Sequence, residues 1–400
     1  GALVRALAHA DLLSPFAIQT AAIPDALVGH DILARASTGS GKTLAFGLPM
    51  ITRVAALPAT PRKPHGLVLV PTRELAMQVN DTLEPLGRSM GLRFKTVAGG
   101  LAMYQQVDAL HRGVDVLVAT PGRLADLIRQ GACSLEDVEV VVVDEADQMA
   151  DMGFLPEVRA LLSDCPKTVQ TLLFSATLDG DVDELIRHHM HEPVRHEIEP
   201  VTSPVDTMEH HLFIVNREDK HHMFSQIAAR DGRTIMFVRS QLGCERVADT
   251  IAAGGVRVLA LHGGMSQSQR TRAMADFKSG RVPVLVATDV AARGIHVDDV
   301  SLVVHVDPPE DSKAYLHRAG RTARAGARGR VVTLALRNQT RAMERLHERA
   351  GVTATKERVE LLDAHVIATT GAKPVHLDPA LLPQRTPDAR PRAHTPRPRR

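Results

Sequence analysis

Short apolar runs, each followed by a small polar cluster, recur along this chain of 400 residues. Clear examples are residues 67–70, 114–118 and 171–174, and helical patterns such as 74–86 and 124–130 lie between the runs. Strands that alternate with helices indicate βαβ units in a parallel sheet. Because the carboxyl ends of parallel strands meet at one edge of the sheet, we expect the polar clusters to gather along that edge.

The same pattern breaks once and then restarts. Residues 198–204 contain two prolines and little helical periodicity, which is typical of a linker. Five further apolar runs follow, at 234–238, 257–261, 284–286, 302–306 and 331–336. The sequence therefore predicts two tandem α/β domains. We expect a first domain at 1–198, a linker at 199–207, a second domain at 208–351, and an extension with a tail at 352–400.

A complete phosphate-binding loop follows the first of the apolar runs, residues 32–34. Its sequence is Ala36-Ser37-Thr38-Gly39-Ser40-Gly41-Lys42-Thr43. Such a loop offers backbone N–H groups to phosphate, a lysine to the β- and γ-phosphates, and a hydroxyl to magnesium. The segment predicts a site for a nucleoside triphosphate.

The tetrapeptide Asp144-Glu145-Ala146-Asp147 closes a run of four valines, residues 140–143. An uninterrupted valine run is typical of a strand buried on both faces of a parallel sheet. Acids at such a strand end can simply cap the next helix. Combined with a phosphate loop about a hundred residues earlier, however, they indicate a nucleoside triphosphatase.

The second half has no phosphate loop of its own. It carries Thr288-Asp289 after one strand, and the basic cluster His317-Arg318-Ala319-Gly320-Arg321-Thr322-Ala323-Arg324 on an expected helix. One domain would hold the nucleotide and the other would supply arginines. This is the arrangement in which an arginine finger completes a site across a cleft.

Composition limits how the chain can bind nucleic acid. Aromatic residues make up 3% and tryptophan is absent, so stacking of bases on aromatic side chains is not the expected main mode. The net charge of +2 does not by itself suggest a polyanionic partner. Residues 385–400 hold six arginines, four prolines and one acid, which predicts a disordered basic tail. That tail either attracts nucleic acid non-specifically or is an inert solvated end.

The cellular compartment is suggested by cysteine usage. Cys133, Cys165 and Cys244 show neither a disulfide framework nor a zinc-binding spacing, which indicates a reducing cytoplasm. The sequence shows no signal peptide and no long apolar span. We expect a cytoplasmic monomer without a membrane partner.

In this order, the motifs resemble those of the DEAD-box ATP-dependent RNA helicases of superfamily 2, over roughly residues 10–340. Within that family the chain looks most like the short bacterial RhlE-type enzymes. The resemblance implies two tandem RecA-like domains with a cleft between them, and ATP with Mg²⁺ as cofactors. It implies RNA-stimulated ATP hydrolysis coupled to local, sequence-independent unwinding of RNA duplexes or to remodelling of RNA–protein particles. Single-stranded or short duplex RNA would be the partner, with ribosomal or degradosome components as further candidates.

The resemblance also implies a role for each residue around the nucleotide. Gln19 is similar to the glutamine that reads adenine, and Asp289 is similar to the residue that contacts the ribose. Thr43 and Asp144 would hold magnesium, partly through water. The nucleotide-binding set is Gln19, Ser37, Thr38, Gly39, Ser40, Gly41, Lys42, Thr43 and Asp289.

Chemistry and coupling are assigned in the same way. Glu145 would orient the attacking water, and Arg321 and Arg324 would meet the γ-phosphate, where an arginine finger is worth roughly 10³–10⁵ in rate. The catalytic set is Lys42, Asp144, Glu145, Arg321 and Arg324. The set that couples hydrolysis to domain closure is Asp147, Ser175, Thr177 and His317.

The implied RNA face draws on both domains. Its members are Pro71, Thr72, Arg73, Gly99, Gly100, Thr120, Gly122, Arg123, Gly263, Gln267, Arg270 and Thr288. Contacts to the RNA backbone carry no base information, so binding would be largely independent of sequence. Contacts to 2′-hydroxyls would favour RNA over DNA.

Three positions depart from the family pattern. Ala323 stands where glycine is common, and would be harmless if the backbone there is helical. His296 stands where an aspartate is usual, which we expect to weaken coupling between the domains. No aromatic residue suited to stack on adenine precedes Phe16. That aromatic is either absent or lies upstream of Gly1, and adenine affinity is expected to be lower without it.

Two other functions remain open at this point. The chain could be an ATP-gated RNA clamp or assembly factor that separates few duplexes, because intact ATPase residues do not reveal the mechanical output. It could also be a DNA helicase or translocase, although processive DNA enzymes of this superfamily usually carry different motifs and additional domains.

Overall fold

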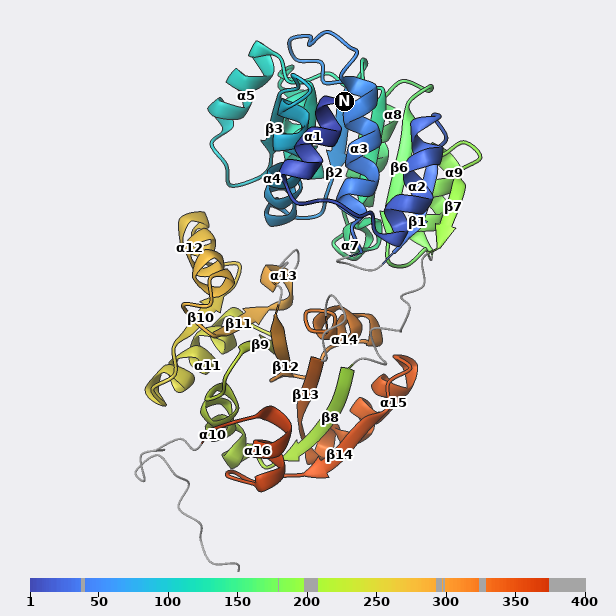
Figure 1. The fold of residues 1–400 in the computed structure, drawn as a ribbon. Helices are drawn as coiled ribbons and strands as arrows, with labels where there is room; N and C mark the ends of the chain where they lie inside the picture. Colours follow the sequence, from blue (N-terminus) through green and yellow to red (C-terminus); the bar gives the residue numbers. More distant parts are fainter. Residues whose placement is uncertain are drawn as a thin grey trace, which may run out of the picture.

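The computed structural model describes residues 1–36, 40–178, 180–197, 208–292, 297, 299–323 and 329–373. These residues form two α/β domains, the upper and lower halves of Figure 1. Several predictions concern positions outside the described residues. They are those on Ser37, Thr38, Gly39, the linker 199–207, His296, Arg324 and the tail.

The first domain is built on a seven-stranded sheet in which every pair of neighbours is parallel. In spatial order its strands are β3 (Phe94–Val97), β4 (Val116–Ala119), β2 (Gly66–Leu69), β5 (Val140–Asp144), β6 (Gln170–Ser175), β1 (Ile32–Arg35) and β7 (Val194–Glu197). The helices are α1 (Ala2–His9), α2 (Ala17–Leu27), α3 (Lys42–Val54), α4 (Arg73–Arg88), α5 (Met103–Arg112), α6 (Pro121–Arg129), α7 (Ala146–Asp151), α8 (Leu155–Ser163) and α9 (Asp181–His189).

The second domain repeats this plan strand for strand, again with parallel neighbours. Its order is β10 (Val258–Leu261), β11 (Val284–Thr288), β9 (Arg233–Val238), β12 (Val300–His305), β13 (Gly329–Leu336), β8 (Met208–Val215) and β14 (Ala354–Arg358). The helices are α10 (Arg217–Ala228), α11 (Gln241–Ala253), α12 (Gln267–Lys278), α13 (Asp289–Ala292), α14 (Ser312–Ala319), η1 (Arg337–Gln339), α15 (Thr340–Arg349) and α16 (Ala364–Thr370). The predicted pair of tandem parallel-sheet domains is confirmed.

The second domain extends beyond its predicted end at residue 351. Strand β14 pairs with β8 from Ala354 to Arg358 and forms an edge of the sheet. It is only partly buried and carries charged residues at three consecutive positions, 356–358, so it lacks the apolar run that marks the inner strands. The edge strand β7 was not predicted for the same reason, because it is partly exposed and lacks an apolar run.

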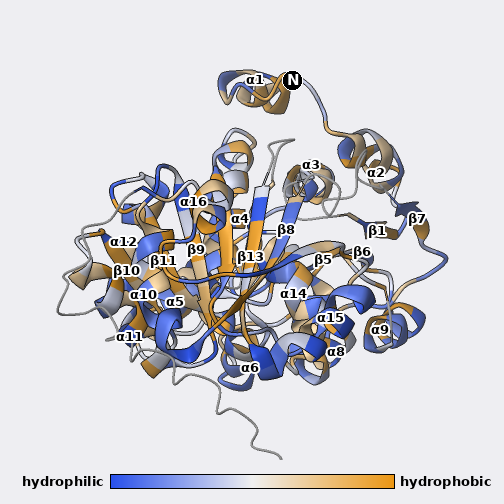
Figure 2. Ribbon diagram, turned by 90° about the horizontal axis from the view of Figure 1, so that it is seen from below, coloured by the Kyte–Doolittle hydropathy of each residue, from blue (hydrophilic) through white to orange (hydrophobic). Residues whose placement is uncertain are grey.

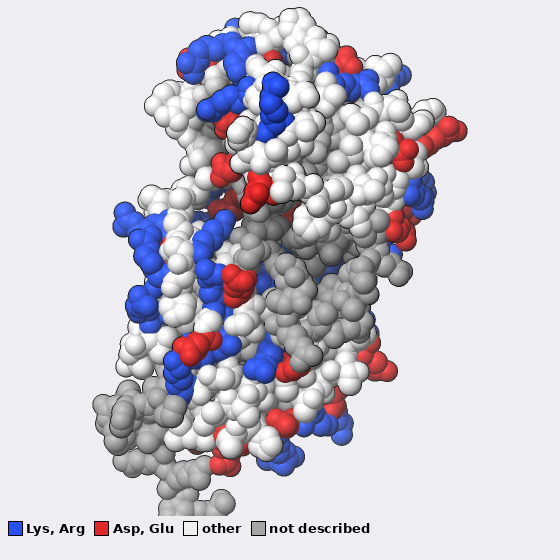
Figure 3. Space-filling view, in the orientation of Figure 1, with Lys and Arg blue, Asp and Glu red and all other residues white. Residues whose placement is uncertain are grey.

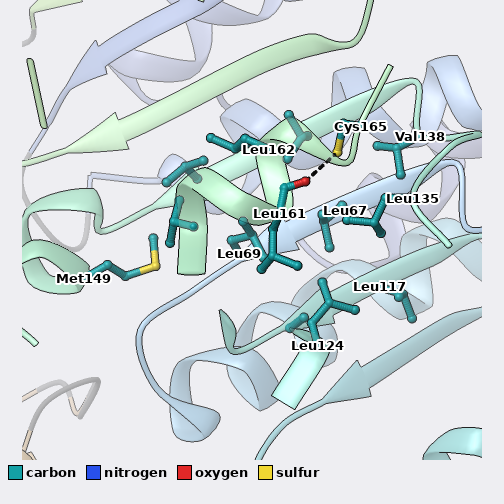
Figure 4. Packing of buried hydrophobic residues seen from close by; sticks show 14 of the residues in the cluster. Leu67, Leu69, Leu117, Leu124, Leu135, Val138, Met149, Leu161, Leu162 and Cys165 are labelled. Atoms are coloured by element: carbon teal, nitrogen blue, oxygen red, sulfur yellow. Dashed lines mark hydrogen bonds between the residues drawn. The ribbon is translucent and has the colours of Figure 1, made fainter. Parts of the chain in front are cut away.

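The valine run of β5 divides between two apolar layers. Val141 and Val143 pack beneath α6, α7 and α8, part of which is seen in Figure 4. Val140 and Val142 face the opposite layer, beneath α2 and α3. All four are fully buried, and full burial of one valine stabilises a fold by roughly 1.5–3 kcal/mol.

Figure 2 shows inner strands such as β9 and β13 as mainly hydrophobic, with hydrophilic faces on outer helices. Among the described residues, we find no helix long and apolar enough to cross a membrane.

A cluster of buried histidines packs against α14, and from it we expect the second domain to lose stability in acid. The His305 ring lies 4.8 Å from the Tyr315 ring in an edge contact, and its Nδ1 is 3.1 Å from Thr333 Oγ1. The His347 ring makes a second edge contact with Tyr315, also at 4.8 Å. Burial holds the pKa of His305 well below its usual value, and the positive charge of Arg318 lowers it further. Burial also lowers the pKa of His347.

We therefore expect the stability of the second domain to be complete above about pH 6.5 and to fall as the pH drops below that value. In the unfolded chain these histidines then take up protons that the folded core excludes. Urea unfolding at pH 7.5 and 5.5 measures the effect, and His305→Asn should flatten the pH slope. An unchanged slope in that variant would assign the acid sensitivity to other groups.

Candidate functional site

The phosphate loop joins β1 to α3 and needs glycine at its last turn. Gly41, which precedes α3, has φ +88°, a conformation that side chains other than glycine rarely adopt. A Cβ at this position would lie 2.6 Å from Gln19 Nε2 and 2.8 Å from Phe16 Cδ2. The loop is therefore packed directly against the segment expected to read adenine, and any larger residue at Gly41 would separate the two.

Gln19 is buried and already makes two hydrogen bonds within the chain. Its Nε2 donates to the Gly41 carbonyl at 2.9 Å, and its Oε1 accepts from the Phe16 N–H at 2.9 Å. An amide has two N–H donors and two acceptor lone pairs, so one of each remains for a ligand. The side chain can thus contact a base edge while it links that contact to the phosphate loop.

The two acids after β5 sit close to the phosphate-loop lysine. Lys42 Nζ lies 3.7 Å from Asp144 Oδ1, and both side chains are almost fully buried. Burial raises the pKa of Asp144 and of Glu145, while the charge of Lys42 opposes that shift in both. Glu145 has φ +54°, a strained conformation for a residue with a side chain, of the kind that concentrates at functional sites.

This acidic site fits a hydrated magnesium ion. Asp144 and Glu145 are buried beside Lys42 and Arg321, and Thr43 adds a hydroxyl oxygen at the start of α3. Within the described residues, no group of three or more His, Cys, Asp or Glu side chains could hold a metal ion. Magnesium commonly binds through one or two carboxylates, with phosphate and water as its other ligands. Asp144 and Thr43 are the residues suited to hold it.

Asp147 connects the strand end of β5 to that of β6. Its backbone N–H donates to Ser175 Oγ at 3.2 Å, and its Oδ2 accepts from the Thr177 N–H at 3.2 Å. Ser175 Oγ in turn donates to the Thr177 carbonyl at 2.6 Å. The strands β5 and β6 are neighbours in the sheet, with Asp144 opposite Phe174. Strand order thus brings together three of the four predicted coupling residues.

The second domain places Arg321 and His317 over these acids. Arg321 follows α14, donates from Nε to the His317 carbonyl at 3.3 Å, and is close enough that its charge lowers the pKa of Glu145, against the dominant effect of burial. Burial lowers the pKa of His317, and the charge of Asp147 opposes that change. The predicted division of the site between two domains is therefore present in the structure.

A cavity of about 400 Å³ opens between the domains at this place. It is lined by Gln148, Asp151, Phe237, Arg239, Thr288, Asp289, Val290, Ala292, Glu310, Asp311, Lys313, Ala314, His317, Arg318 and Arg321. The first two belong to the first domain and all the others to the second. The α7 and α14 labels in Figure 1 mark the two walls.

Arg318 is a site residue that sequence reasoning missed. Its Nε and Nη2 donate to the two carboxylate oxygens of Asp289 at 2.6 Å each, and its Nη1 donates to the Asp307 carbonyl at 2.8 Å. Its guanidinium also lies 5.3 Å from the centre of the Phe237 ring. A two-pronged ion pair of this kind fixes the Asp289 carboxylate. Adjacency to His317 was the one sequence signal that could have identified it.

The predicted RNA-face residues of the first domain surround the Gly99–Gly100 loop. Arg73 Nη1 donates to the Gly99 carbonyl at 2.9 Å, and Arg123 Nη1 donates to the Leu101 carbonyl at 3.1 Å. These guanidiniums therefore brace the loop as well as adding positive charge. Exposed glycines leave the backbone accessible at Gly99, Gly100, Gly122 and, in the second domain, Gly263. The side chains of Pro71, Thr72 and Thr288 are buried, and that of Thr120 is partly buried.

Glu74 contacts predicted RNA-face residues of both domains. Its Oε1 lies 3.0 Å from Arg270 Nη2 and 3.3 Å from Arg73 Nη2. Arg270 is on α12, where Gln267 donates to Thr271 Oγ1 at 3.2 Å. Figure 3 shows Lys and Arg side chains gathered on the α12 side of the second domain. A strand bound along both domains would thus lie over a pre-existing contact between them.

The predicted helix over residues 317–324 ends early, and this corrects the expectation for Ala323. Helix α14 stops at Ala319, and Ala323 has φ +54° in the left-handed region. The expectation that a helical backbone would make this alanine harmless is therefore wrong. For a residue with a Cβ the left-handed conformation costs roughly 1–2 kcal/mol.

We expect Ala323→Gly to leave the free energy of unfolding unchanged or raised by up to about 1 kcal/mol, because relief of strain exceeds the gain in unfolded-state entropy. The control Ala275→Gly, at an exposed position inside α12, should cost about 1 kcal/mol. Urea titration compares the two variants. Equal losses would mean that Ala323 is not strained.

Fold and site together define a two-domain protein with a phosphate-loop sequence in one parallel-sheet domain and a buried arginine from the other domain near its acids. Residues 16–185 match the DEAD/DEAH box helicase family, and residues 219–326 match the helicase conserved C-terminal domain. The chain belongs to the DEAD-box family of helicases. Resemblance to that family is thereby confirmed, whereas the finer likeness to RhlE-type enzymes stays a prediction.

Individual relatives agree with this assignment. An ATP-dependent RNA helicase RhlB of Xanthomonas campestris pv. campestris (strain B100) is 41% identical over 343 residues, which cover 84% of this chain and 60% of that protein. Yeast (S. cerevisiae) Dbp5 bound to RNA and ADP BeF3 superposes with a TM-score of 0.77 at 27% identity, covering 89% of this chain and 93% of that one. A DEAD box protein from the hyperthermophile Methanococcus jannaschii is 30% identical, with a TM-score of 0.52 and coverage of 89% and 96%. The chain spans about 60% of the length of the RhlB relatives it matches.

Proposed function

We propose that this chain is an RNA-stimulated ATPase that couples hydrolysis to local, sequence-independent separation of RNA duplexes or to remodelling of RNA–protein particles. The observation that carries the proposal is the approach of Arg321 in the second domain to Glu145 in the first. A site divided in this way is complete only when the domains meet, so a ligand that favours their meeting accelerates the chemistry.

Nucleotide binding would use the first domain. The triphosphate lies against the start of α3, where backbone N–H groups and Lys42 favour negative charge. Gln19 uses its remaining donor and acceptor on adenine, and Asp289, held by Arg318, meets the ribose from the other side of the cleft. Magnesium, held by Thr43 and Asp144, neutralises part of the phosphate charge when it is bound.

Hydrolysis would depend on Glu145 and Arg321. Glu145 accepts a hydrogen bond from the attacking water and orients it, and a raised pKa makes an ionised carboxylate a better proton acceptor. Arg321 keeps its charge although burial lowers its pKa, because an arginine is not deprotonated in proteins. Its guanidinium stabilises the charge that spreads over the phosphoryl oxygens in the transition state.

RNA would bind across both domains through the loops around Gly99 and Gly263 and the first turn of α6 at Gly122. Exposed amides and arginines contact phosphates, so binding discriminates little between sequences. Because the strand crosses the Glu74–Arg270 contact, its binding favours closure. Closure that bends one strand separates a few base pairs locally, and release of phosphate reopens the cleft.

The central test is the rate of ATP hydrolysis without nucleic acid, with RNA, and with DNA of matched sequence. We expect stimulation by RNA and weaker stimulation by DNA. A strand-displacement assay run in parallel separates unwinding from clamping: stimulated ATPase without displacement favours an ATP-gated clamp. Stimulation by DNA equal to that by RNA would favour a DNA translocase, and no stimulation by either would overturn the proposal.

The proposal also covers the location, the oligomeric state and the further partners of the protein. The protein would be a cytoplasmic monomer, with ribosomal or degradosome components as further partners. Three buried free cysteines are compatible with a reducing compartment. Sedimentation of the purified chain with and without RNA tests the monomeric state.

The arginine-rich residues 385–400 are proposed to bind RNA phosphates non-specifically. Their deletion should reduce the slope of log affinity against log salt by about 0.7 for each phosphate that the tail neutralises on single-stranded RNA. RNA affinity measured at several salt concentrations gives this slope. If it is the same in both chains, the tail does not bind RNA.

A further inference from the structure

Three pairs, each made of an acidic and a basic side chain, line the contact between the first domain and the α14 region. Glu145 meets Arg321, Asp147 acts on His317, and Lys313 Nζ lies 2.9 Å from Asp151 Oδ1. The first-domain members are residues 145, 147 and 151, and their partners are residues 321, 317 and 313. The residue numbers rise on one side and fall on the other, so the two segments run antiparallel. Asp147 and Asp151 are four residues apart, as are Lys313 and His317, which is about one helical turn on each side.

The outermost pair lies beyond every residue assigned to the site so far. Asp151 ends α7 and Lys313 is the second residue of α14, and their side chains are 29% and 31% exposed. Both line the cavity between the domains. We propose that Asp151 and Lys313 form an interdomain clasp that aligns α14 on α7 and thereby positions Arg321 at Glu145. The proposal rests on the ATPase activity proposed above.

The clasp acts on closure because its two members belong to different domains. They are 162 positions apart, and neither needs the other for its own domain to fold. The second-domain wall of the cavity carries both acids, Asp289, Glu310 and Asp311, and arginines, Arg239, Arg318 and Arg321. An acid in place of Lys313 would stand directly opposite Asp151. Like charges at that distance repel, and the domains would meet less readily.

The other interdomain ion pair described above, Glu74–Arg270, cannot replace this alignment. It joins α4 to α12 on the RNA face, away from α7 and α14. It brings the domains together without setting the position of α14. Lys313 of the Asp151–Lys313 pair is on the same short helix as His317, one turn away, and Arg321 lies two residues beyond the end of that helix. A change at Lys313 is therefore transmitted directly to the catalytic arginine.

The test is a charge-reversal cycle made in the full chain. Asp151→Lys and Lys313→Asp each place like charges opposite one another. Each should lower RNA-stimulated kcat/KM for ATP roughly 3- to 10-fold, because an attraction worth up to about 5-fold for an exposed pair is replaced by a repulsion of similar size. The double variant restores attraction and should return to within about twofold of the parent. As a matched control, Asp183→Lys, an exposed acid on α9, combined with Lys313→Asp should show no recovery.

Two further readouts distinguish alignment from a general structural defect. The RNA concentration for half-maximal stimulation should rise in the single variants, whereas thermal unfolding should be unchanged. Raising the salt concentration should shrink the difference between parent and variants, because salt screens exposed charges. Failure of the double variant to recover, or a matching loss of thermal stability in the singles, overturns the proposal.

Domain closure can also be measured without ATP hydrolysis. Dyes attached at Asp81→Cys and Arg341→Cys, both exposed positions on different domains, report the distance between them, since the three native cysteines are buried. With RNA and a non-hydrolysable ATP analogue, the single reversals should close less and the double reversal should close as the parent does. An inactive parent that still closes with this pattern would overturn the proposed ATPase and leave the clasp supported. Equal closure in all four proteins would overturn the clasp.

Discussion

Arg321→Ala is expected to reduce RNA-stimulated kcat by about 10³–10⁵-fold, the value of a positioned arginine finger. The guanidinium is the one described cation that the second domain brings to Glu145 with an effect on its pKa. ATP affinity should change much less than kcat, since the phosphates are proposed to bind in the first domain at Lys42 and the start of α3. Single-turnover hydrolysis and nucleotide-binding measurements separate the two quantities.

A matched control for this change is Arg341→Ala, which removes an exposed arginine of α15. It should leave kcat within about twofold of the parent, as expected for a surface substitution. Arg321→Lys should recover little activity, because a single ammonium cannot reproduce the planar fork of arginine. A kcat for Arg321→Ala close to that of the parent would show that another group stabilises the transition state.

Glu145→Gln is expected to lower kcat by about 10²–10⁴-fold while binding of ATP and RNA persists. The substitution keeps the size of the side chain and removes its capacity to accept a proton. It also removes a buried carboxylate whose charged form is disfavoured by burial, so the thermal stability of the free protein should be equal or higher. Stopped-flow ATP hydrolysis and thermal unfolding test both parts.

The control for Glu145→Gln is Glu139→Gln, at an exposed acid one strand length away that pairs with Arg53 at 3.6 Å. Its activity should match that of the parent. If Glu145→Gln hydrolysed ATP at the parent rate, the water would have to be oriented by a different residue, and Asp144 would be the first to investigate.

Much of the first domain could be predicted because its signals are local. The phosphate loop is a continuous segment, and the run of four valines in β5 indicates a buried strand. Lys42 and Asp144 could therefore be expected to meet at the carboxyl edge of one sheet. Asp147 and Ser175 followed from adjacent strands. Edge strands such as β14 were missed because partial exposure allows charged residues and removes the apolar run.

The contacts between domains could not be predicted in the same way. Glu74 and Arg270 are 196 positions apart, and no periodic pattern connects them. The Asp289–Arg318 pair depends on how α13 and α14 lie against each other. The left-handed backbone at Ala323 was hidden for a further reason, because the basic residues around it suggested that the helix would continue.

By itself, the sequence determined a duplicated parallel-sheet plan, a phosphate loop, and the acids and arginines that chemistry on a triphosphate requires. Each of these is encoded within a few consecutive residues or in the period of one strand or helix. Only the tertiary structure decided which residues of one domain face which residues of the other. The reason is physical: ion pairs such as Asp151–Lys313 arise from the docking of two preformed surfaces, and their partners are set by the relative position of whole domains rather than by neighbouring residues.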